Sequence, residues 1–246
     1  MPMEIGQVEA IFRYPVKSMA GERLETAELG WHGLEGDRRL AFRRMDDHSG
    51  FPWLSASKVP SLLLFAPQRR ENSAPGELPT HIRAPDGEDM PVFGEELAAE
   101  VGRRYGGPVQ MMQLNHGSFD EASISVIASD TVRELGRLAG VNEDVRRFRP
   151  NVLVRSLRPV PFQEDAWVGG VLTFGEGHDA PAITVTMRDI RCSIVNFDPD
   201  SAAAAPELLK TVVRVHQNTA GVYGAVTRTG RLAVGQTITF HAAGAG

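Results

Sequence analysis

The chain has 246 residues, a formal net charge of -5 and a single cysteine. An acidic balance argues against general binding of nucleic acid or anionic lipid, because those partners need a basic surface. One cysteine excludes an internal disulfide and a self-contained iron-sulfur cluster, which usually takes four sulfur ligands. The sequence lacks a run of eighteen apolar residues and a basic and apolar signal segment, so we expect a cytoplasmic protein.

The first predicted element is a half-buried strand. Apolar residues alternate with polar ones between Val8 and Tyr14, the pattern of a strand with one face in the core. Pro15 ends the regular pairing because it offers no backbone donor. Lys17 and Ser18 follow on the exit turn, where side chains can point toward a ligand. The alternative interpretation of Lys17 is a solvated lysine after a strand.

A glycine-rich turn over residues 30–36 leads through Asp37 and Arg38 into a second strand. An arginine there suits a phosphate, since its planar guanidinium forms paired, charge-assisted hydrogen bonds. The competing interpretation is an ordinary surface ion pair between Asp37 and Arg38. The pattern further predicts, in chain order, a short helix over 58–64, a hairpin of 81–83 and 90–93, a helix over 97–105 and a strand over 109–114.

The second half begins near residue 115 with a linker that contains Ser123. A short apolar strand over 124–127 follows, and Ser129 is a candidate cap for a helix that ends at Gly140. Next comes a basic loop, in which Arg149 and Asn151 are held in fixed directions by the proline between them. In an acidic protein this loop is a local positive site, although a solvated basic loop is the plain alternative.

The cysteine follows a predicted strand over 183–187, in the stretch Asp189-Ile190-Arg191-Cys192. A thiolate beside a guanidinium is held in its reactive, metal-ligating form. Taken alone, a lone cysteine is more often a small buried hydrophobe, and a nucleophile for acyl transfer is a further possibility. The remaining elements are a glycine-interrupted strand over 167–175, a helix over 206–215 and closing hairpin strands over 222–240.

Three segments in this order resemble the MOSC family, whose members bind the molybdenum-pterin cofactor through a cysteine: Tyr14-Pro15-Val16-Lys17-Ser18, Phe148-Arg149-Pro150-Asn151 and Arg191-Cys192. The resemblance implies an α+β, β-rich fold. We expect a MOSC-type β-barrel with flanking helices over 115–246, and a smaller, partly interleaved N-terminal lobe over 1–114 whose first strands can pack with the barrel.

The resemblance also implies the site. Cys192 would be the molybdenum ligand and the catalytic residue, and the cofactor would be bound by Lys17, Ser18, Arg38, Ser123, Arg149, Asn151 and Arg191. Arg146 and Arg147 match less closely and are candidate accessory contacts. Relatives often show threonine, alanine, arginine and glutamine where this chain has Ser55-Ala56-Ser57-Lys58. The arginine is absent here, and Lys58, one place later, is the candidate to supply its charge.

The functional relatives implied are the mitochondrial amidoxime-reducing component and bacterial enzymes that reduce N-hydroxylated bases. We therefore expect a molybdenum-cofactor-dependent reductase of N-hydroxylated compounds, with electrons from an external ferredoxin-type or flavoprotein-type donor. The alternative is a non-catalytic module that binds or carries the cofactor or transfers its sulfur. A third possibility makes Lys17 a Schiff-base lysine. The seven histidines lack metal-binding spacing, which argues against a zinc hydrolase.

Overall fold

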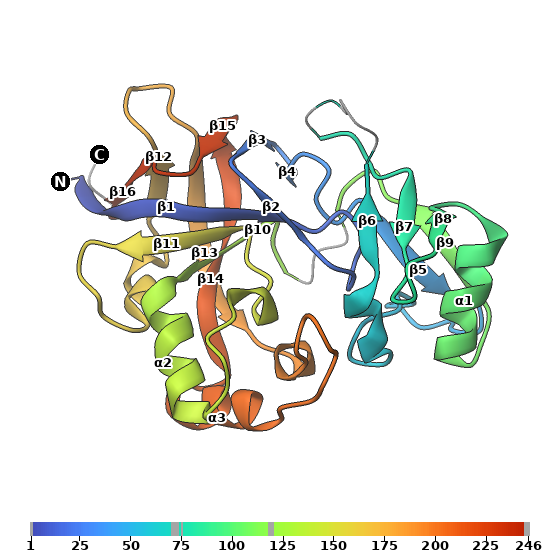
Figure 1. Cartoon of the computed structure of the whole chain (residues 1–246). Helices are drawn as coiled ribbons and strands as arrows, with labels where there is room; N and C mark the ends of the chain where they lie inside the picture. Colours follow the sequence, from blue (N-terminus) through green and yellow to red (C-terminus); the bar gives the residue numbers. More distant parts are fainter. Residues whose placement is uncertain (1, 70–73, 75, 118–120, 244–246) are drawn as a thin grey trace.

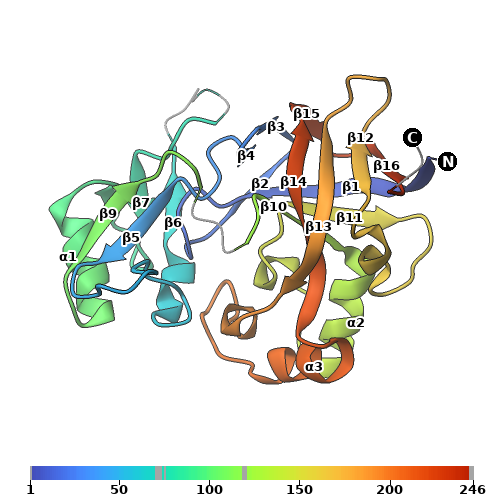
Figure 2. The ribbon, with the colours of Figure 1, turned by 180° about the vertical axis from the view of Figure 1, so that it is seen from behind.

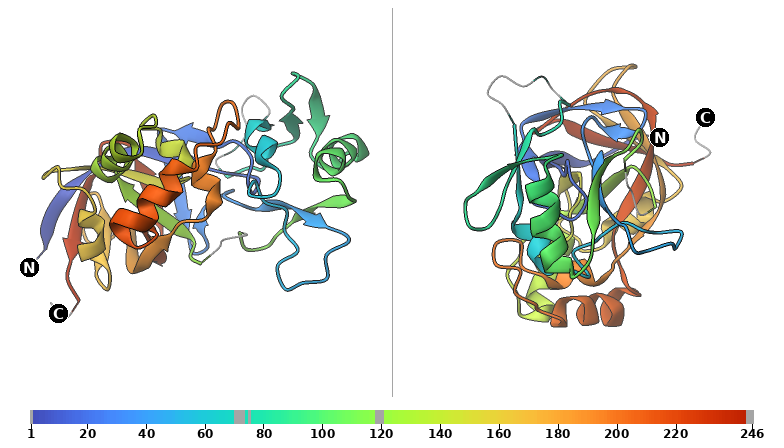
Figure 3. Two further views of the ribbon diagram at one scale, coloured as in Figure 1. Left: turned by 90° about the horizontal axis from the view of Figure 1, so that it is seen from below. Right: turned by 90° about the vertical axis from the view of Figure 1, so that its right-hand side faces the viewer.

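Two β-rich lobes lie beside each other, as Figure 1 shows from the front and Figure 3 from below and from the side. The computed structural model describes residues 2–69, 74, 76–117 and 121–243. The larger lobe, on the left of Figure 1, is a barrel with two helices against it. The smaller lobe, on the right, contains one α-helix among the described residues. This β-rich architecture with flanking helices confirms the predicted fold class.

A closed ring of seven described strands forms the larger lobe. In barrel order they are β11 (Val152–Ser156), β10 (Ile124–Ala128), β14 (Thr219–Arg228), β13 (Ala182–Ile190), β12 (Val171–Phe174), β16 (Thr237–His241) and β1 (Met3–Arg13). β1 pairs antiparallel with both β16 and β11, which closes the ring. Figure 2 shows β13 and β14 side by side in the barrel wall. The first strand of the chain therefore belongs to the barrel.

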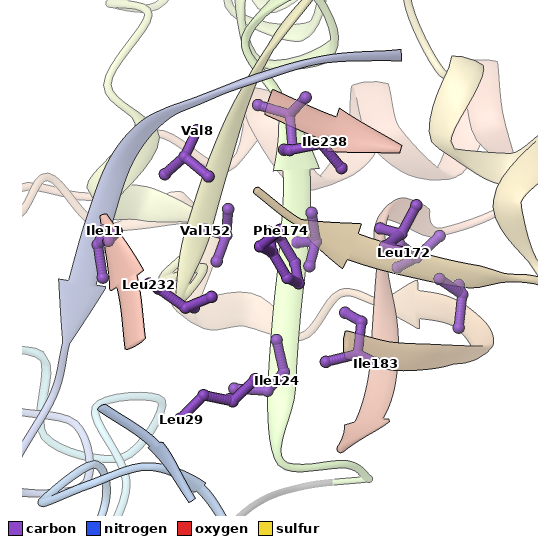
Figure 4. Close-up of a cluster of buried hydrophobic side chains, with 14 of the residues drawn as sticks. Val8, Ile11, Leu29, Ile124, Val152, Leu172, Phe174, Ile183, Leu232 and Ile238 are labelled. Carbon is purple, nitrogen blue, oxygen red and sulfur yellow. The ribbon is translucent and has the colours of Figure 1, made fainter. Parts of the chain in front are cut away.

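Side chains of β1 pack into two different cores. Val8 and Ile11 belong to the barrel interior, where Figure 4 shows them with Val152 and Ile238. Phe12 belongs instead to a cluster between the barrel and its helices. The register of β1 against β11 shifts between Val8 and Ala10, so Val8 and Ile11 share the interior face although they are three residues apart. Ala10 lies with Phe12 on the opposite face, and β1 therefore departs at this irregularity from the simple alternation that the sequence predicted.

The helices α2 (Ser129–Ala139) and α3 (Glu207–His216) pack against the barrel through this second cluster. The sequence indicated Ser129 as the cap of α2, and this prediction was wrong. The capping position is Ala128, whose backbone N–H donates to the Glu164 carboxylate at 3.4 Å. A side chain distant in sequence thus serves the orphan donor at this helix start, which local pattern could not reveal.

The smaller lobe has a separate core, which includes Leu40, Phe42, Leu62 and Leu97. Its elements are β5 (Leu40–Arg44), η1 (Pro60–Leu64), β6 (Ala66–Gln68), β7 (His81–Arg83), β8 (Asp89–Pro91), α1 (Glu95–Tyr105) and β9 (Val109–Gln113). β5 pairs with β9, and β6, β7 and β8 form a three-stranded sheet. The predicted helix ends at Gly106, which adopts the left-handed conformation that glycine tolerates.

Four short strands complete the interleaving of the two halves. They are β2 (Glu22–Leu24), β3 (Thr26–Gly30), β4 (Gly33–Leu34) and β15 (Gly230–Ala233). β2 pairs with β1, while β15, from the end of the chain, pairs with β3. The domain boundary between residues 114 and 115 remains a prediction, since both ends of the chain contribute to shared sheets.

Three short 3-10 helices lie in the loops of the second half: η2 (Val145–Arg147), η3 (Gln163–Trp167) and η4 (Ser193–Asn196). The strand predicted from residue 167 was wrong at its start, because Trp167 ends η3 and β12 begins at Val171. None of the helices that the structure describes has the length and apolar character needed to cross a bilayer.

Candidate functional site

One cavity of about 280 Å³ gathers most of the residues that the sequence singled out. The first sixty residues contribute Lys17, Ser18, Arg38, Phe51, Ser55 and Ser57, and the barrel half contributes Ser125, Phe148, Arg149, Asp189, Ile190, Arg191, Cys192, Ile194, Val195 and Tyr223. Phe51, Ile190 and Cys192 are exposed and form part of its rim. Buried polar residues, among them Ser18, Ser125 and Asp189, line its deeper part.

The cysteine stands at this rim because β13 ends at Ile190, two residues before it. Cys192 is exposed and occupies the N-cap position of η4. The guanidinium of Arg191 turns inward: its Nε donates to the Ala220 carbonyl and its Nη1 to the Phe148 carbonyl, both at 2.7 Å. The backbone therefore directs Cys192 outward and Arg191 into the wall.

Arg38 is anchored by a buried acid. The Asp37 carboxylate, almost fully buried, accepts a hydrogen bond from the Tyr14 backbone N–H at 2.6 Å and forms an ion pair with Arg38. A second Arg38 nitrogen donates to the Arg149 carbonyl at 2.9 Å. Burial disfavours charge on Arg38, but Asp37 and the Tyr14 side chain together outweigh burial and raise the pKa of the guanidinium. The ion pair between Asp37 and Arg38 therefore exists, as the competing interpretation of the sequence had it. It does not lie on the open surface, because the Asp37 carboxylate is buried, and it keeps Arg38 charged.

The guanidinium of Arg149 stacks over an aromatic ring. Its central carbon lies 4.2 Å from the centre of the Tyr14 ring, and that of Arg38 lies 5.0 Å from the same ring. Burial raises the pKa of Tyr14 to about 12, so the phenol stays neutral. Arg149 also donates to the Met19 carbonyl at 2.8 Å. Tyr14 is thus a platform that positions two cations.

Asn151 braces the site from below the cavity surface. Its side-chain oxygen accepts hydrogen bonds from the Ser125 backbone N–H at 3.1 Å and from Arg38 at 3.4 Å. Its amide nitrogen donates to Asp37 at 3.0 Å and to the Phe12 carbonyl at 3.3 Å. Because it is almost fully buried and makes four bonds, Asn151 acts here by fixing the groups that line the cavity.

Three cavity residues have left-handed backbone conformations. The φ angles are 67° at Ser18, 50° at Arg38 and 50° at Arg149. Such angles cost free energy at residues other than glycine, and they are concentrated where function constrains the backbone. In this fold they turn three predicted ligand-binding residues toward one space.

Three neighbouring strands supply a polar group at the inner wall. Ser125 of β10 is paired directly with Tyr223 of β14, which is in turn paired with β13. The Asp189 carboxyl of β13 accepts a hydrogen bond from the Ser125 hydroxyl at 2.8 Å and lies 2.7 Å from Arg191. Burial raises the pKa of Asp189 to about 6, against the opposing effects of Arg191 and Ser125.

The charges that line the cavity favour an anion. Among the described lining residues, four are cationic, namely Lys17, Arg38, Arg149 and Arg191, and one is a carboxyl, Asp189. The Lys17 ammonium lies 5.3 Å from the centre of the Phe51 ring at the rim. Cations that are partly buried attract an anion more strongly than solvated ones. An exposed thiol and an anion-binding wall therefore share one cavity.

Two family models match the sequence of this chain. The chain matches the family described as the MOSC domain over residues 106–239, and the MOSC N-terminal beta barrel domain over residues 5–123. The chain belongs to the MOSC domain family. The N-terminal match includes β1, which closes the MOSC barrel of the second half, so the two matched regions are physically one assembly.

A solved structure of similar length shares this fold. The crystal structure of the YuaD protein from Bacillus subtilis aligns over 98% of this chain and 98% of its own, with 15% identity and a TM-score of 0.53. The YiiM protein from Geobacillus stearothermophilus aligns over 50% of this chain and 56% of its own, with 18% identity and a TM-score of 0.39. No protein of curated function matches the chain.

MOSC domains bind the molybdenum cofactor, and the residues of this cavity fit such a group. A single thiolate gives one soft ligand, so a metal at Cys192 would need further ligands from a cofactor. The cationic wall suits the phosphate of a pterin, because guanidinium groups bind phosphate oxygens in pairs. Lys17, Ser18, Arg38 and Arg149 are the lining residues that could hold that anion.

Some predicted contacts lie elsewhere in this MOSC structure. Ser123 precedes β10, and its carbonyl faces Gly33 instead of the cavity. Lys58 is exposed outside the lining, where Ser55 and Ser57 take part. Arg146 pairs with Asp144 and Asp200, and Arg147 pairs with Asp198. Asp120, in the linker that precedes Ser123, lies outside the described residues.

The sequence reasoning assigned no role to three polar residues of the inner wall, which are Ser125, Asp189 and Tyr223. A signal existed for Ser125, which interrupts the apolar run Ile124-Ser125-Val126 as the one polar group of a fully buried strand. Buried polar side chains need partners, so such an interruption indicates a site or a network. Asp189 and Tyr223 carry no comparable local signal.

Proposed function

We propose that this MOSC protein is a molybdenum-cofactor-dependent oxidoreductase that reduces N-hydroxylated compounds such as amidoximes, with Cys192 as the metal ligand. The supporting observation is the exposed Cys192 thiol at the rim of a cavity with four cationic side chains. When bound, the cofactor would supply the two-electron redox chemistry. An external electron-donor protein of the ferredoxin or flavoprotein type would provide the electrons, in the cytoplasm.

The protein's own residues have two roles in this proposal. Lys17, Arg38 and Arg149 hold the anionic end of the cofactor, and Asp37 and Tyr14 fix the two guanidinium groups. Cys192 is accessible from outside, so a substrate can approach the metal that the thiolate ligates. The network around Asn151 keeps both halves of the site in register before binding, which lowers the entropy cost of forming it.

The same accessibility of Cys192 favours a second candidate, a module that carries the cofactor or passes its sulfur to a partner protein. Benzamidoxime reduction with a chemical electron donor separates the two candidates. The holoprotein should form benzamidine over many turnovers, and the Cys192→Ser variant should lose at least 99% of that rate. Transfer of cofactor to an apo-enzyme without benzamidine formation would replace the reductase proposal with the carrier.

A further inference from the structure

The inner wall of the cavity contains a hydrogen-bonded chain that the anion-binding role does not use. Asp189, only 1% exposed, accepts a hydrogen bond from the Ser125 hydroxyl at 2.8 Å and is also hydrogen-bonded by the Tyr223 side chain. Tyr223 is half-buried and lines the cavity. A carboxyl that solvent hardly reaches is therefore connected to the cavity through two hydroxyl groups.

The Asp189 carboxyl is the one acidic group among the described residues that line this anion-binding cavity. A carboxylate there weakens the attraction of Arg38 and Arg191 for an anion, whereas a protonated carboxyl does not. The groups that face Asp189 are Arg191 beyond its own strand, Arg38 from the first half, Ser125 from β10 and Tyr223 from β14. Burial outweighs these stabilising partners, so the pKa of Asp189 is raised to about 6. A bound anion would favour the protonated form further.

We propose that Asp189 and Tyr223 form a proton relay, in which the Tyr223 hydroxyl donates to the oxygen that leaves the N-hydroxylated substrate and Asp189 restores the proton to Tyr223. This inference rests on the proposed reductase function. Tyr223 would be the catalytic residue, and Asp189 a positioning residue that also stores the proton. Ser125 fixes the carboxyl orientation.

The reaction balances with the relay in place. Two electrons from the external donor reach the substrate, and the N–O bond breaks. The departing OH group takes one proton from Tyr223 and leaves as water, while the nitrogen takes a second proton from solvent and becomes N–H. Asp189 then returns a proton to Tyr223 and is reprotonated from solvent. General acid catalysis of this kind contributes about 10²–10⁴-fold in rate.

Asp189→Asn tests the relay because asparagine keeps the shape and cannot donate an acidic proton. In holoprotein, with rates expressed per bound molybdenum, kcat for benzamidoxime should fall about 100-fold with little change in KM. Wild-type kcat should decline as pH rises above the pKa of the carboxyl, and this decline should be missing in the variant. Asp189→Glu should restore part of the rate, and Tyr223→Phe should lose as much as Asp189→Asn.

Asp179→Asn is the matched control, because Asp179 is fully exposed in the turn between β12 and β13. This variant should have the kcat, the KM and the pH profile of the wild type. Cofactor-free protein gives a readout independent of turnover. Infrared titration of wild type that is isotope-labelled only at its aspartate carboxyls, so that buried glutamates are not detected, should show a buried aspartate that titrates above the ordinary aspartate range. Asp189→Asn should lack this signal.

Unchanged kcat and an unchanged pH profile in Asp189→Asn, or the absence of that carboxyl from the infrared titration, would overturn the relay. Wild-type holoprotein that turns over no N-hydroxylated probe would instead contradict the reductase function, and with it the role of the relay in that reaction. The two failures are distinguishable, because the infrared result is obtained without cofactor.

Discussion

Two buried carboxyls in the second half are held by different surroundings. Asp189 lines the cavity, whereas Glu164 is completely buried at the start of α2, away from it. The Glu164 carboxylate accepts hydrogen bonds from the Thr131 hydroxyl at 2.9 Å and from the Ala128 N–H at 3.4 Å. Burial nevertheless raises the pKa of Glu164 to about 7. We assign Glu164 to stability and Asp189 to the site.

Glu164→Gln should flatten the pH dependence of stability. Because the folded-state pKa is raised, the stabilising effect of protonated Glu164 is complete below the unfolded-state pKa and is lost as pH rises through about 7. The shift of the wild type corresponds to roughly 3 kcal/mol at most. Urea unfolding at pH 5 and pH 8 should show that the free energy of unfolding falls less with rising pH in Glu164→Gln than in wild type. Equal losses in the two proteins, with exposed Glu176→Gln as the control, would contradict this assignment.

At the residue level, the sequence could indicate side chains that belong to local motifs. Lys17, Arg38, Arg149 and Cys192 come together in the cavity as the resemblance implied, although their roles remain predictions. Asp37 was taken as a candidate surface partner because local sequence contains no information on burial. Its partners Tyr14 and Asn151 are 23 and 114 positions away, so only the fold reveals the network.

Strained backbone conformations of this fold lie in its turns, whereas its strands follow local sequence patterns. Ser18 follows β1 with a φ of 67° and is buried in the cavity wall. No sequence pattern predicted positive φ at Ser18, Arg38 or Arg149, because residues other than glycine adopt it only when tertiary contacts impose it. Strands such as β1 and β13 were predictable, since an alternating apolar face is a local property.

Ser18→Gly tests this strain at the level of the turn. Glycine adopts positive φ without a steric penalty, so the free energy of unfolding should stay the same or rise by up to about 1 kcal/mol. Ser18→Val should lower it by about 2 kcal/mol, because a β-branched residue tolerates this conformation poorly. Chemical denaturation of the two cofactor-free variants makes the comparison. Equal destabilisation by glycine and valine would show that the turn is not strained.

At the scale of the whole molecule, the site depends on strands from both ends of the chain. β1 closes the barrel against β11 and β16, although it lies more than a hundred residues before either. Alternation predicted the strand itself but not its partners, because strand pairing depends on contacts distant in sequence. The smaller lobe has its own core, yet Arg38 and Ser18 reach the cavity only through the interleaving of the halves.

A chain of residues 115–246 should therefore not fold independently. Without β1, the strands β11 and β16 become open edges, and the barrel loses the buried contacts of Val8 and Ile11. We expect the isolated segment to aggregate or to unfold without a cooperative transition, whereas the full chain unfolds cooperatively. Circular dichroism during thermal unfolding of both chains makes the measurement. A cooperative transition of the fragment at the full-chain midpoint would contradict the role of β1.

The central claim is that Cys192 ligates a molybdenum atom whose cofactor is held by the cationic wall of the same cavity. Molybdenum and pterin content per chain tests it most directly, in wild type and Cys192→Ser purified from a host that makes the cofactor. The account predicts close to one molybdenum and one pterin per wild-type chain, with most of the molybdenum lost in the variant. Wild type that contains neither, or a variant that retains full molybdenum, would contradict it.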